Sequence, residues 1–367
     1  FSVSTKEKFE HYDFKDLDNY IKKYNWYATS KSNMVQFFRT SERRPLNQLE
    51  KFEPLCWVDM INPTDDEVED VAAISGISED MLASALDDEE RARAEIDDGN
   101  YMFILDCPVI EEGDSGDVYS TLPLAVIYNS KCVVTVSLKG NPVLKDFITG
   151  RQKVLTEKPV LFTLNFMLGN AKRFLNVLTQ IDRKSRRVQA ELGRTMKNEE
   201  IAQLLDLENS LVYISTSLNS NYSVQEKLSK AEAVTTREDY QDLYDDVAIE
   251  SKQAMEMCNI YKDILTVTMD AYGSMISNNA NDSMKKLTVI TVLLAIPTMI
   301  AGFWGMNVVV PGQIGEDGSS SVWFWIILAA TLVLTVAVGI FLGKFMRSGG
   351  AIKRTRRARR RKDKDKK

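Results

Sequence analysis

The stretch Leu287–Asn307 reads LTVITVLLAIPTMIAGFWGMN. Its first eighteen residues carry no charge, and a second charge-free run, Val322–Gly343, follows after a short loop. Both runs have the roughly 17 to 25 residues that a helix needs to cross the hydrocarbon core of a bilayer. The sequence therefore predicts a two-helix transmembrane domain, residues 287–345, near the end of the chain.

The charges beside the two runs indicate their orientation. The loop between them carries Glu316 and Asp317 but no Lys or Arg. Basic residues precede the first run and follow the second: Lys285, Lys286, Lys344, Arg347, Lys353 and Arg354. Because basic flanking segments stay on the cytoplasmic side, we expect an integral protein of a cell (inner) membrane, with both its N- and C-termini in the cytoplasm.

The end of the chain is strongly basic, although the protein as a whole is acidic. From Lys344 to Lys367 there are thirteen Lys or Arg against two Asp, a charge of +11, and the total of −6 therefore leaves −17 for residues 1–343. We interpret residues 346–367 as a basic cytoplasmic tail that binds anionic membrane lipids, at roughly 1 kcal/mol per basic residue near the surface. Nucleic acid is a weaker candidate partner, because this tail lacks aromatic residues on which bases stack.

Residues 1–155 are typical of a cytoplasmic α/β domain. Four short apolar, β-branched runs predict strands: Leu55–Met60, Tyr101–Ile110, Leu122–Tyr128 and Cys132–Leu138. Thr64 and Glu67 have capping-box spacing, which predicts a helix that ends at Gly76, and a second short helix begins near Ser78. The glycine-rich and nucleophile motifs of nucleotide-binding proteins and hydrolases do not occur in the sequence, so we do not expect an enzyme.

The cysteines and the single histidine form no metal-binding or nucleophile pattern. Cys56, Cys107, Cys132 and Cys258 lie far apart without a CxxC pair, which favours small buried side chains over disulfides or a thiolate zinc site. His11 stands alone in a polar segment. The chain therefore has no imidazole cluster for zinc or for a catalytic triad.

Residues 156–286 predict a cytoplasmic helical bundle and a stalk. From Pro159 onward glycine and proline almost vanish, and Lys, Arg, Glu, Gln and Leu dominate. An apolar stripe then recurs at steps of three and four residues: Ile260, Ile264, Val267, Ala271 and Met275. No proline interrupts the chain from this stripe into the first span, so we expect one helix from near Arg237 to near Trp304, on the order of 100 Å long at 1.5 Å per residue.

One face of this helix combines small, polar and apolar residues. At steps of three or four residues it carries Asn281, Met284, Leu287, Thr291, Ala295, Thr298 and Gly302. Such residues pack helices together in many membrane bundles. If several copies of the chain surround an axis, the same face lines a pore. The residues by themselves leave both interpretations open.

A tripeptide and its position in the chain point to a known family. Gly305-Met306-Asn307 follows Trp304 at the end of the first span, Pro297 lies inside that span, and a basic tail follows the second span. Together with the long helix and the acidic α/β domain, this arrangement resembles the CorA family of magnesium channels. The resemblance implies a pentameric funnel, a homopentamer in which the first spans line the pore and the second spans lie outside them.

The resemblance also implies roles for the residues of the pore. Asn307 would form a ring at the outer mouth, where carboxamide oxygens accept hydrogen bonds from the waters that Mg²⁺ retains. Gly305 would add a main-chain carbonyl to this selectivity filter, and Met306 would pack behind the ring. Thr291 and Thr298 align with the family's polar pore positions. The hydrophobic constriction and the cytoplasmic exit would be formed by Leu287, Met284 and Asn281.

Regulation by cytoplasmic Mg²⁺ is a further implication of the resemblance. Ions bound between neighbouring protomers hold the channels of the family closed. The aligned acid on the long helix is Asp246, and its partner on the adjacent protomer would be Asp80, in the short helix after Ser78. Mg²⁺ would then be both the transported ion and the regulatory ligand, and closure would follow internal Mg²⁺ by linkage. The alternative for both acids is a solvated helix face.

Two alternatives stand beside a passive Mg²⁺ channel. The spans hold no Asp, Glu, His, Lys or Arg, which favours a passive pore over a proton-coupled carrier. A zinc, cobalt or nickel transporter on the same scaffold is one alternative, although zinc-handling relatives tend to carry Ile where this chain has Met306. The other is a membrane-anchored regulatory or enzymatic domain, which predicts a polar catalytic cluster in residues 1–155. The loop Val308–Gln313 lacks the Met-Pro-Glu that the family often has, so the outer acidic ring is displaced to Glu316 and Asp317 or missing.

Overall fold

The computed structural model describes residues 34–42, 44–113, 116–195, 198–306, 322 and 325–344. The chain divides into two compact units, residues 1–269 and residues 270–367. The first unit holds a sheet with helices on both faces, and the second holds the end of a long helix together with a further apolar helix. The long helix, α8 (Glu238–Trp304), begins in the first unit and ends in the second.

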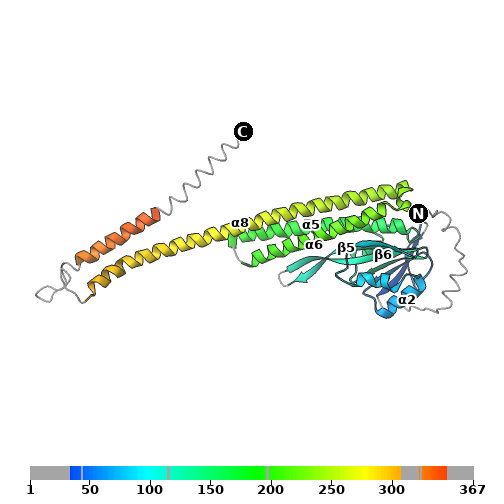
Figure 1. Cartoon of the computed structure of the whole chain (residues 1–367), viewed down its shortest axis with the longest axis horizontal. Coiled ribbons are helices and arrows are strands. Elements are labelled where there is room, and N and C mark those ends of the chain that lie inside the picture. Colours follow the sequence, from blue (N-terminus) through cyan, green and yellow to red (C-terminus); the bar gives the residue numbers. More distant parts are fainter. Residues whose placement is uncertain are drawn as a thin grey trace, which may run out of the picture. The chain divides into compact units, whose positions relative to one another are not determined.

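A mixed seven-stranded sheet forms the centre of the first unit (Figure 1). The strands are β1 (Val35–Ser41), β2 (Arg44–Leu49), β3 (Cys56–Ile61), β4 (Arg93–Asp97), β5 (Asn100–Gly113), β6 (Gly116–Tyr128) and β7 (Cys132–Ser137). They lie in the order β2-β1-β3-β7-β6-β5-β4. Only the β3–β7 pair is parallel among the described strands, and β2 and β4 are the edges of the sheet.

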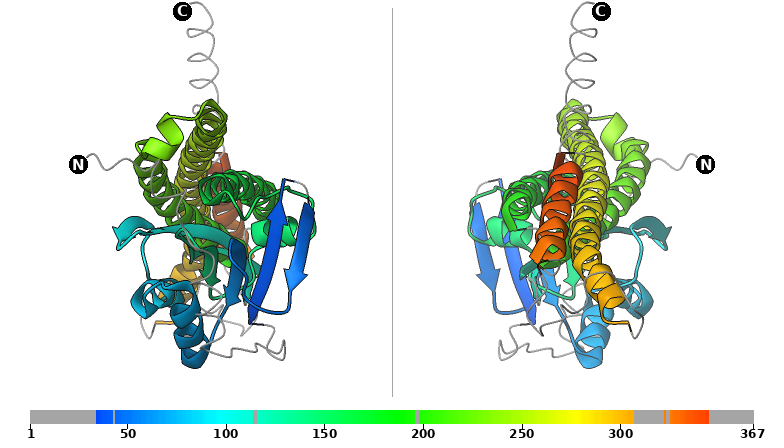
Figure 2. Two further views of the ribbon diagram at one scale, coloured as in Figure 1. Left: turned by 90° about the vertical axis from the view of Figure 1, so that its right-hand side faces the viewer. Right: turned by 90° about the vertical axis from the view of Figure 1, so that its left-hand side faces the viewer.

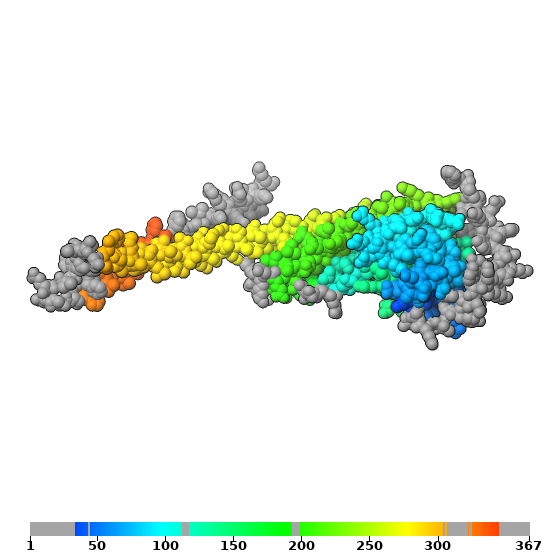
Figure 3. All heavy atoms as spheres, turned by 60° about the horizontal axis from the view of Figure 1, so that its bottom comes forward, coloured from blue at the N-terminus to red at the C-terminus, as the bar shows by residue number. Residues whose placement is uncertain are grey.

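Helices cover both faces of this sheet. They are α2 (Asp65–Ser75), α3 (Glu79–Ala83), the 3₁₀ turn η1 (Ser84–Leu86), α4 (Pro142–Ile148), α5 (Pro159–Thr195), α6 (Asn198–Ser229) and α7 (Glu232–Thr235). Helices α2 and α3 lie on one face, and α5 and α6 lie on the other (Figures 1 and 2). In the space-filling view the green atoms of α6 adjoin the cyan atoms of β4 to β6 (Figure 3).

The alternation of side chains along β3 divides the hydrophobic interior into two cores. Trp57 packs with Phe147 of α4 and Phe162 of α5 on one face of the sheet. Cys56 and Val58 point to the other face, into the core that α2 and α3 cover. A strand that is buried on both faces is expected to read as an apolar run, and β3 does so apart from Asp59, which is why the sequence predicts this strand.

The first helix begins and ends where the sequence predicts. Thr64 Oγ1 accepts a hydrogen bond from the main-chain N–H of Glu67 (3.4 Å), and the Glu67 carboxylate accepts one from the main-chain N–H of Thr64 (2.9 Å). The helix ends at Gly76, whose φ of 76° lies in the left-handed region that favours glycine. Ser78 caps α3 by accepting from the N–H of Met81 (3.4 Å). Both helix predictions are confirmed, and α3 carries Asp80 in its first turn.

The long helix is confirmed as 67 continuous residues. Within the first unit it buries Val247, Ala254, Cys258 and Leu265. The predicted apolar stripe lies on a different face of the helix and is exposed in a single chain: Ile260, Ile264, Val267, Ala271 and Met275. Helix α8 therefore has two apolar faces. The rest of a single chain covers the face with Val247, Ala254, Cys258 and Leu265 and leaves the predicted stripe exposed.

In the second unit, an apolar helix formed by Trp325–Lys344 accompanies the end of α8. Gly339 of this helix lies against Leu293 of α8, because a Cβ atom placed on the glycine would come within 3.3 Å of Leu293 Cδ2. Both helices contain a stretch long and apolar enough to cross a membrane, as the sequence predicts.

The sequence analysis missed β1, β2, β4 and α4. Strand β2 contains Pro45, and charged side chains dominate β4. Both are edge strands, where proline and charge are tolerated because one side of the strand has no partner. The four predicted strands are confirmed with shifted ends, and all four cysteines are free and buried. His11 lies outside the described residues, and the domain boundaries at residues 155, 286 and 345 stay predictions.

Candidate functional site

The predicted pore face of α8 is exposed in a single chain. All seven of its residues are exposed: Asn281, Met284, Leu287, Thr291, Ala295, Thr298 and Gly302. None of them is needed to fill a core within the chain. The face is therefore open to another copy, to lipid or to an ion pathway.

The other side of the same segment contacts the second apolar helix. The partly buried residues there are Val289, Leu293, Ile296 and Ile300. With 3.6 residues per turn, the centre of this apolar face lies about 150° around the helix from the centre of the predicted pore face. Leu293 contacts Gly339. The second helix thus covers the apolar side of α8 and leaves the mixed polar side uncovered.

The two threonines of the open face are tied to the helix backbone. Thr291 Oγ1 donates to the carbonyl of Leu287 (2.9 Å), and Thr298 Oγ1 donates to the carbonyl of Leu294 (2.7 Å). Each hydroxyl uses its only proton in this bond, and its oxygen keeps a lone pair as an acceptor. The open face therefore presents oxygen acceptors that carry no formal charge.

Helix α8 ends at Trp304, directly before the tripeptide that marks the end of the first span. The Gly305 N–H donates to the carbonyl of Ala301 (3.0 Å), which continues the helical pattern by one residue. The Met306 side chain is half exposed in a single chain. Asn307, the loop after it and the basic tail 346–367 lie outside the described residues.

The two predicted regulatory acids lie on separate elements of the first unit. Asp246 is exposed on α8, and Asp80 is exposed on α3. Within the described part of one chain, no three His, Cys, Asp or Glu side chains gather into a potential metal site. Among the described residues of one chain, neither Asp246 nor Asp80 therefore belongs to a cluster of three such side chains.

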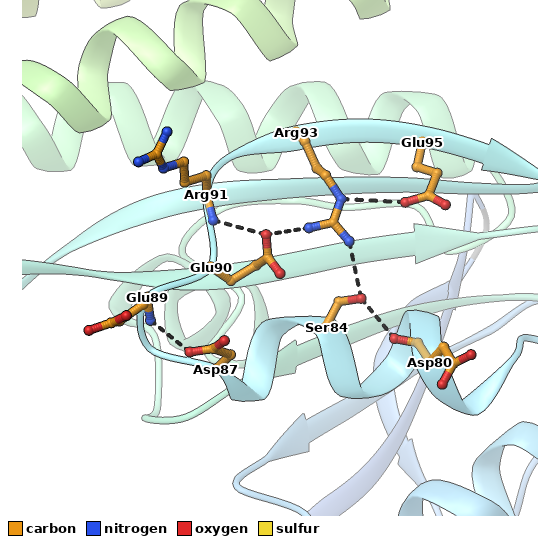
Figure 4. Close-up of polar contacts among 8 residues, drawn as sticks. All are labelled: Asp80, Ser84, Asp87, Glu89, Glu90, Arg91, Arg93 and Glu95. Carbon is orange, nitrogen blue, oxygen red and sulfur yellow. Dashed lines mark hydrogen bonds and ion pairs between the residues drawn. The ribbon is translucent and has the colours of Figure 1, made fainter.

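Asp80 lies next to a charged network at the edge of the sheet (Figure 4). Arg93 of β4 forms ion pairs with Glu90 and, from Nε to Oε2, with Glu95 (3.4 Å). Its Nη2 donates to Ser84 Oγ (3.4 Å), and Ser84 Oγ donates to the main-chain carbonyl of Asp80 (2.7 Å). A continuous series of contacts thus joins the edge strand to the backbone of the helix that carries Asp80.

The sequence analysis missed this network. Burial acts to lower the pKa of Arg93, but the ion pairs with Glu90 and Glu95 outweigh it and raise the pKa above its usual value, so the guanidinium stays charged. Arg93 and Glu95 stand two residues apart, a spacing that places both on one face of a strand. That signal becomes readable only when β4 is recognised as a strand.

Comparison with known proteins identifies the family. The model of the family described as CorA-like Mg²⁺ transporter protein matches residues 52–344. A cobalt/magnesium transport protein CorA from Methanocaldococcus jannaschii is 28% identical over 302 residues, which cover 80% of this chain and 91% of that protein. The protein of the same name from Thermotoga maritima is 23% identical over 293 residues, covering 76% and 79%.

The fold agrees with a solved structure from the same archaeon. The complete structure of the CorA magnesium transporter from Methanocaldococcus jannaschii matches with a TM-score of 0.69 at 23% identity, covering 86% of this chain and 98% of that chain. The soluble α/β part, the long helix and the apolar C-terminal helix all fall within this match. By its sequence over most of its length, this chain belongs to the CorA-like Mg²⁺ transporter family.

Proposed function

We propose that this CorA-family divalent-cation transporter is a passive magnesium channel, a homopentamer in a cell membrane whose first spans line the pore. The family supports the class of activity. Two relatives that are named cobalt/magnesium transport proteins support the choice of ion. The basic residues that flank the two spans support cytoplasmic N- and C-termini.

The observation that carries the proposal is the open face of α8. The second helix covers the side of α8 that holds Leu293, and the side that holds Thr291 and Thr298 stays exposed. When several copies surround an axis with their second helices outside, these open faces meet around a common pathway. Their uncharged oxygens suit an ion that keeps most of its water.

Passive flux is supported by the composition of the spans. The runs Leu287–Trp304 and Val322–Gly343 contain no ionisable side chain, and proton-coupled carriers depend on such groups within the membrane. The driving force is then the membrane potential, about 2.3 kcal/mol per charge per 100 mV and about twice that for a divalent ion.

Assembly is supported by the second apolar face of α8. Ile260, Ile264 and Val267 are 54%, 49% and 68% exposed in a single chain. A stripe of this kind on a long helix is buried by other helices in a stable protein. Copies of α8 that pack side by side bury it, and the resemblance to the family supports five of them.

The selectivity filter in this proposal is Gly305-Met306-Asn307. Mg²⁺ dehydrates reluctantly, and a ring of Asn307 carboxamides accepts hydrogen bonds from its waters without holding the ion by charge. Thr298 and Thr291 continue the path, Leu287 and Met284 form a hydrophobic constriction, and Asn281 stands at the exit.

Internal Mg²⁺ closes the channel in this proposal by binding between Asp246 of one copy and Asp80 of the next. Both side chains are exposed in a single chain and are therefore accessible to a neighbour. Carboxylates are common protein ligands of Mg²⁺. Ions that bind only the closed arrangement stabilise it by mass action.

The basic tail 346–367 is proposed to bind anionic headgroups at the cytoplasmic surface. It follows the second span directly. Co²⁺ is the second transported ion that we consider, because both relatives are named cobalt/magnesium transport proteins.

The test is Mg²⁺ uptake into proteoliposomes that contain the intact chain and a magnesium-sensitive dye. An inside-negative potential is imposed without a proton gradient, and internal Mg²⁺ is set low or high. The Asn307→Ala variant is compared with Asn219→Ala, a matched change at an exposed position of α6. Co²⁺ uptake is measured in the same vesicles.

We expect uptake by the intact chain and by Asn219→Ala, loss of Mg²⁺ uptake or of its selectivity in Asn307→Ala, and less uptake at high internal Mg²⁺. Uptake that needs a proton gradient would overturn the passive channel. Uptake that is indifferent to Asn307→Ala would overturn the filter, and transport of Co²⁺ alone would establish a different cargo.

A further inference from the structure

The helix that carries Asp80 is short and depends on its surroundings for its position. Helix α3 has five residues and continues into the single turn η1. Helices of this length are not stable by themselves in water. Met81 and Leu82 anchor one side of α3 in the hydrophobic core. On the opposite, exposed side, the main-chain carbonyl of Asp80 accepts hydrogen bonds from the N–H and the hydroxyl of Ser84.

Arg93 supplies the contact from the sheet. Its guanidinium lies between Glu90, in the segment before β4, and Glu95, on β4 itself (Figure 4). Its remaining nitrogen, Nη2, reaches Ser84 Oγ at 3.4 Å. Ser84 in turn donates to the main-chain carbonyl of Asp80 at 2.7 Å. The fixed planar fork of an arginine can serve three such partners at once, whereas a lysine offers only a single nitrogen.

We propose that Arg93 is a positioning residue for the regulatory ion: held by Glu90 and Glu95, it fixes through Ser84 the backbone that presents Asp80 to the neighbouring copy. This inference rests on the proposed closure of the channel by Mg²⁺ at Asp80. It adds that the affinity of the site is set by a network on the edge strand, outside the residues that touch the ion.

Substitution of Arg93 has two effects on the affinity for Mg²⁺, and they have opposite signs: one comes from the loss of its charge, the other from the loss of its contacts. Arg93 is a cation near a site for a divalent cation, so removing its charge by itself strengthens Mg²⁺ binding. Removing its contacts leaves the Asp80 carbonyl held only by the N–H and hydroxyl of Ser84, without the tie to the sheet. This weakens Mg²⁺ binding, because outer partners of metal ligands typically contribute 10- to 100-fold in affinity. The sign of the change therefore separates the two effects.

Arg91 provides a matched control. It lies two residues before Arg93, carries the same charge, and its guanidinium points away from the network in Figure 4. Its main-chain N–H donates to Glu90 Oε1 at 3.0 Å, a contact that a side-chain substitution keeps. Arg91→Gln and Arg93→Gln thus remove equal charge from nearby positions, and only the second removes the contact to Ser84.

The experiment measures, in proteoliposomes of the full chain, the internal Mg²⁺ concentration that halves the uptake. For Arg93→Gln we expect a value about tenfold higher than for the intact chain, with unchanged maximal uptake at low internal Mg²⁺. Arg91→Gln should give a value equal to or below that of the intact chain. Equal values for the two glutamine variants, or a lower value for Arg93→Gln, would overturn the positioning role.

Two further variants separate this role from general damage to the fold. Ser84→Ala changes no charge and should shift the half-closing concentration in the same direction as Arg93→Gln, by a smaller factor. Arg93→Lys keeps the charge and should restore only part of the sensitivity. A loss of maximal uptake in these variants without any shift would show a structural role alone.

Asp80→Asn distinguishes failure of this inference from failure of the proposed function. If Asp80→Asn leaves the half-closing concentration unchanged, the regulatory site itself is wrong. If Asp80→Asn raises it, the combined Asp80→Asn, Arg93→Gln variant should show no additional shift, because Arg93 acts through Asp80. Additive shifts would mean that Arg93 acts elsewhere.

Discussion

The Asn221 side chain pairs with the main chain of Asp106 as a neighbouring strand would. Asn221 Oδ1 accepts from the Asp106 N–H at 2.8 Å, and Asn221 Nδ2 donates to the Asp106 carbonyl at 2.8 Å. Asn170 of α5 adds a second donor to the same carbonyl, at 2.9 Å. Two carboxamides from two helices therefore complete the hydrogen bonds of one residue of the sheet.

The end of the edge strand explains this arrangement. Strand β4 pairs with β5 through Asp97–Asn100, Glu95–Met102 and Arg93–Ile104. In an antiparallel ladder every second residue directs its N–H and carbonyl to the same neighbouring strand. Asn100, Met102 and Ile104 direct theirs to β4. Asp106 directs its groups to the same side, but β4 does not extend far enough to pair with it. Its main-chain groups would be orphaned under α6 without the asparagines.

We expect Asn221→Ala to destabilise the first unit by about 1 to 3 kcal/mol, because it leaves the Asp106 N–H without its partner and leaves the carbonyl with Asn170 alone. Urea unfolding of the full chain in detergent measures the loss, and hydrogen exchange of β5 locates it at Asp106. Asn219→Ala, on the exposed side of the same helix, is the control and should cost less than about 0.5 kcal/mol. Equal effects of the two substitutions would contradict the strand-like role of Asn221.

Asp59 is a buried acid without an ion-pair partner among the described residues. Its side chain is 2% exposed, and Thr135 Oγ1 donates to its Oδ1 at 2.7 Å, while the Trp57 indole N–H donates to that hydroxyl at 2.8 Å. Burial raises the pKa of Asp59 to about 6, and the bond from Thr135 offsets part of this rise.

Asp59 should make the fold less stable as the pH rises. Because its folded pKa exceeds its unfolded pKa, the acid favours the folded state most below about pH 4, and this contribution is lost as pH rises through about 6. The stability of Asp59→Asn relative to the intact chain should thus increase by about 2 kcal/mol between pH 4 and pH 7.5. Urea unfolding at both values measures this change, and a constant difference would show that Asp59 does not titrate in that range.

Gly169 on α5 leaves room for Val143 on α4. A Cβ atom at Gly169 would lie 2.5 Å from Val143 Cγ1, and overpacking of this kind typically costs about 1 to 3 kcal/mol. We expect Gly169→Ala to lower the urea midpoint of the full chain. Val143→Ala removes the clashing methyl groups, so the double variant should be more stable than the sum of the two single effects predicts. Strict additivity would show that the close contact is absent.

The pore face can be mapped with a water-soluble thiol reagent during Mg²⁺ uptake. Ala295→Cys and Thr298→Cys should react and block flux, whereas Leu293→Cys and Ile296→Cys, on the side that meets the second helix, should not. The native cysteines are buried, which keeps the background reaction low: Cys56, Cys107, Cys132 and Cys258. A reversed pattern would place the pathway on the other side of α8.

The elements that the sequence predicts are those whose signal is local. The two apolar runs, the capping box at Thr64 and the buried strands each depend on neighbouring residues, and each is found in the structure. The edge strands β2 and β4 lack such a signal, because half of each strand faces solvent and tolerates Pro45 or a series of charges.

The candidate site likewise has one part that local sequence patterns predict and another that depends on contacts between distant residues. The open face of α8 follows from helical spacing alone, and the structure supplies what the spacing left undecided, namely the side that Gly339 approaches. The contacts of Arg93 depend on bringing β4 beside η1. The proposed pairing of Asp80 with Asp246 joins two copies of the chain, so neither the sequence nor one chain displays it.

The inward bonds of Thr291 and Thr298 have a consequence for ions of the opposite sign. Both hydroxyl protons are given to the helix backbone, so on the proposed pathway a chloride ion would meet lone pairs and no donors at these two positions. On that pathway the two threonines would disfavour anions without placing a charge in the membrane, and their neutral oxygens would not hold a divalent cation so strongly that it fails to leave.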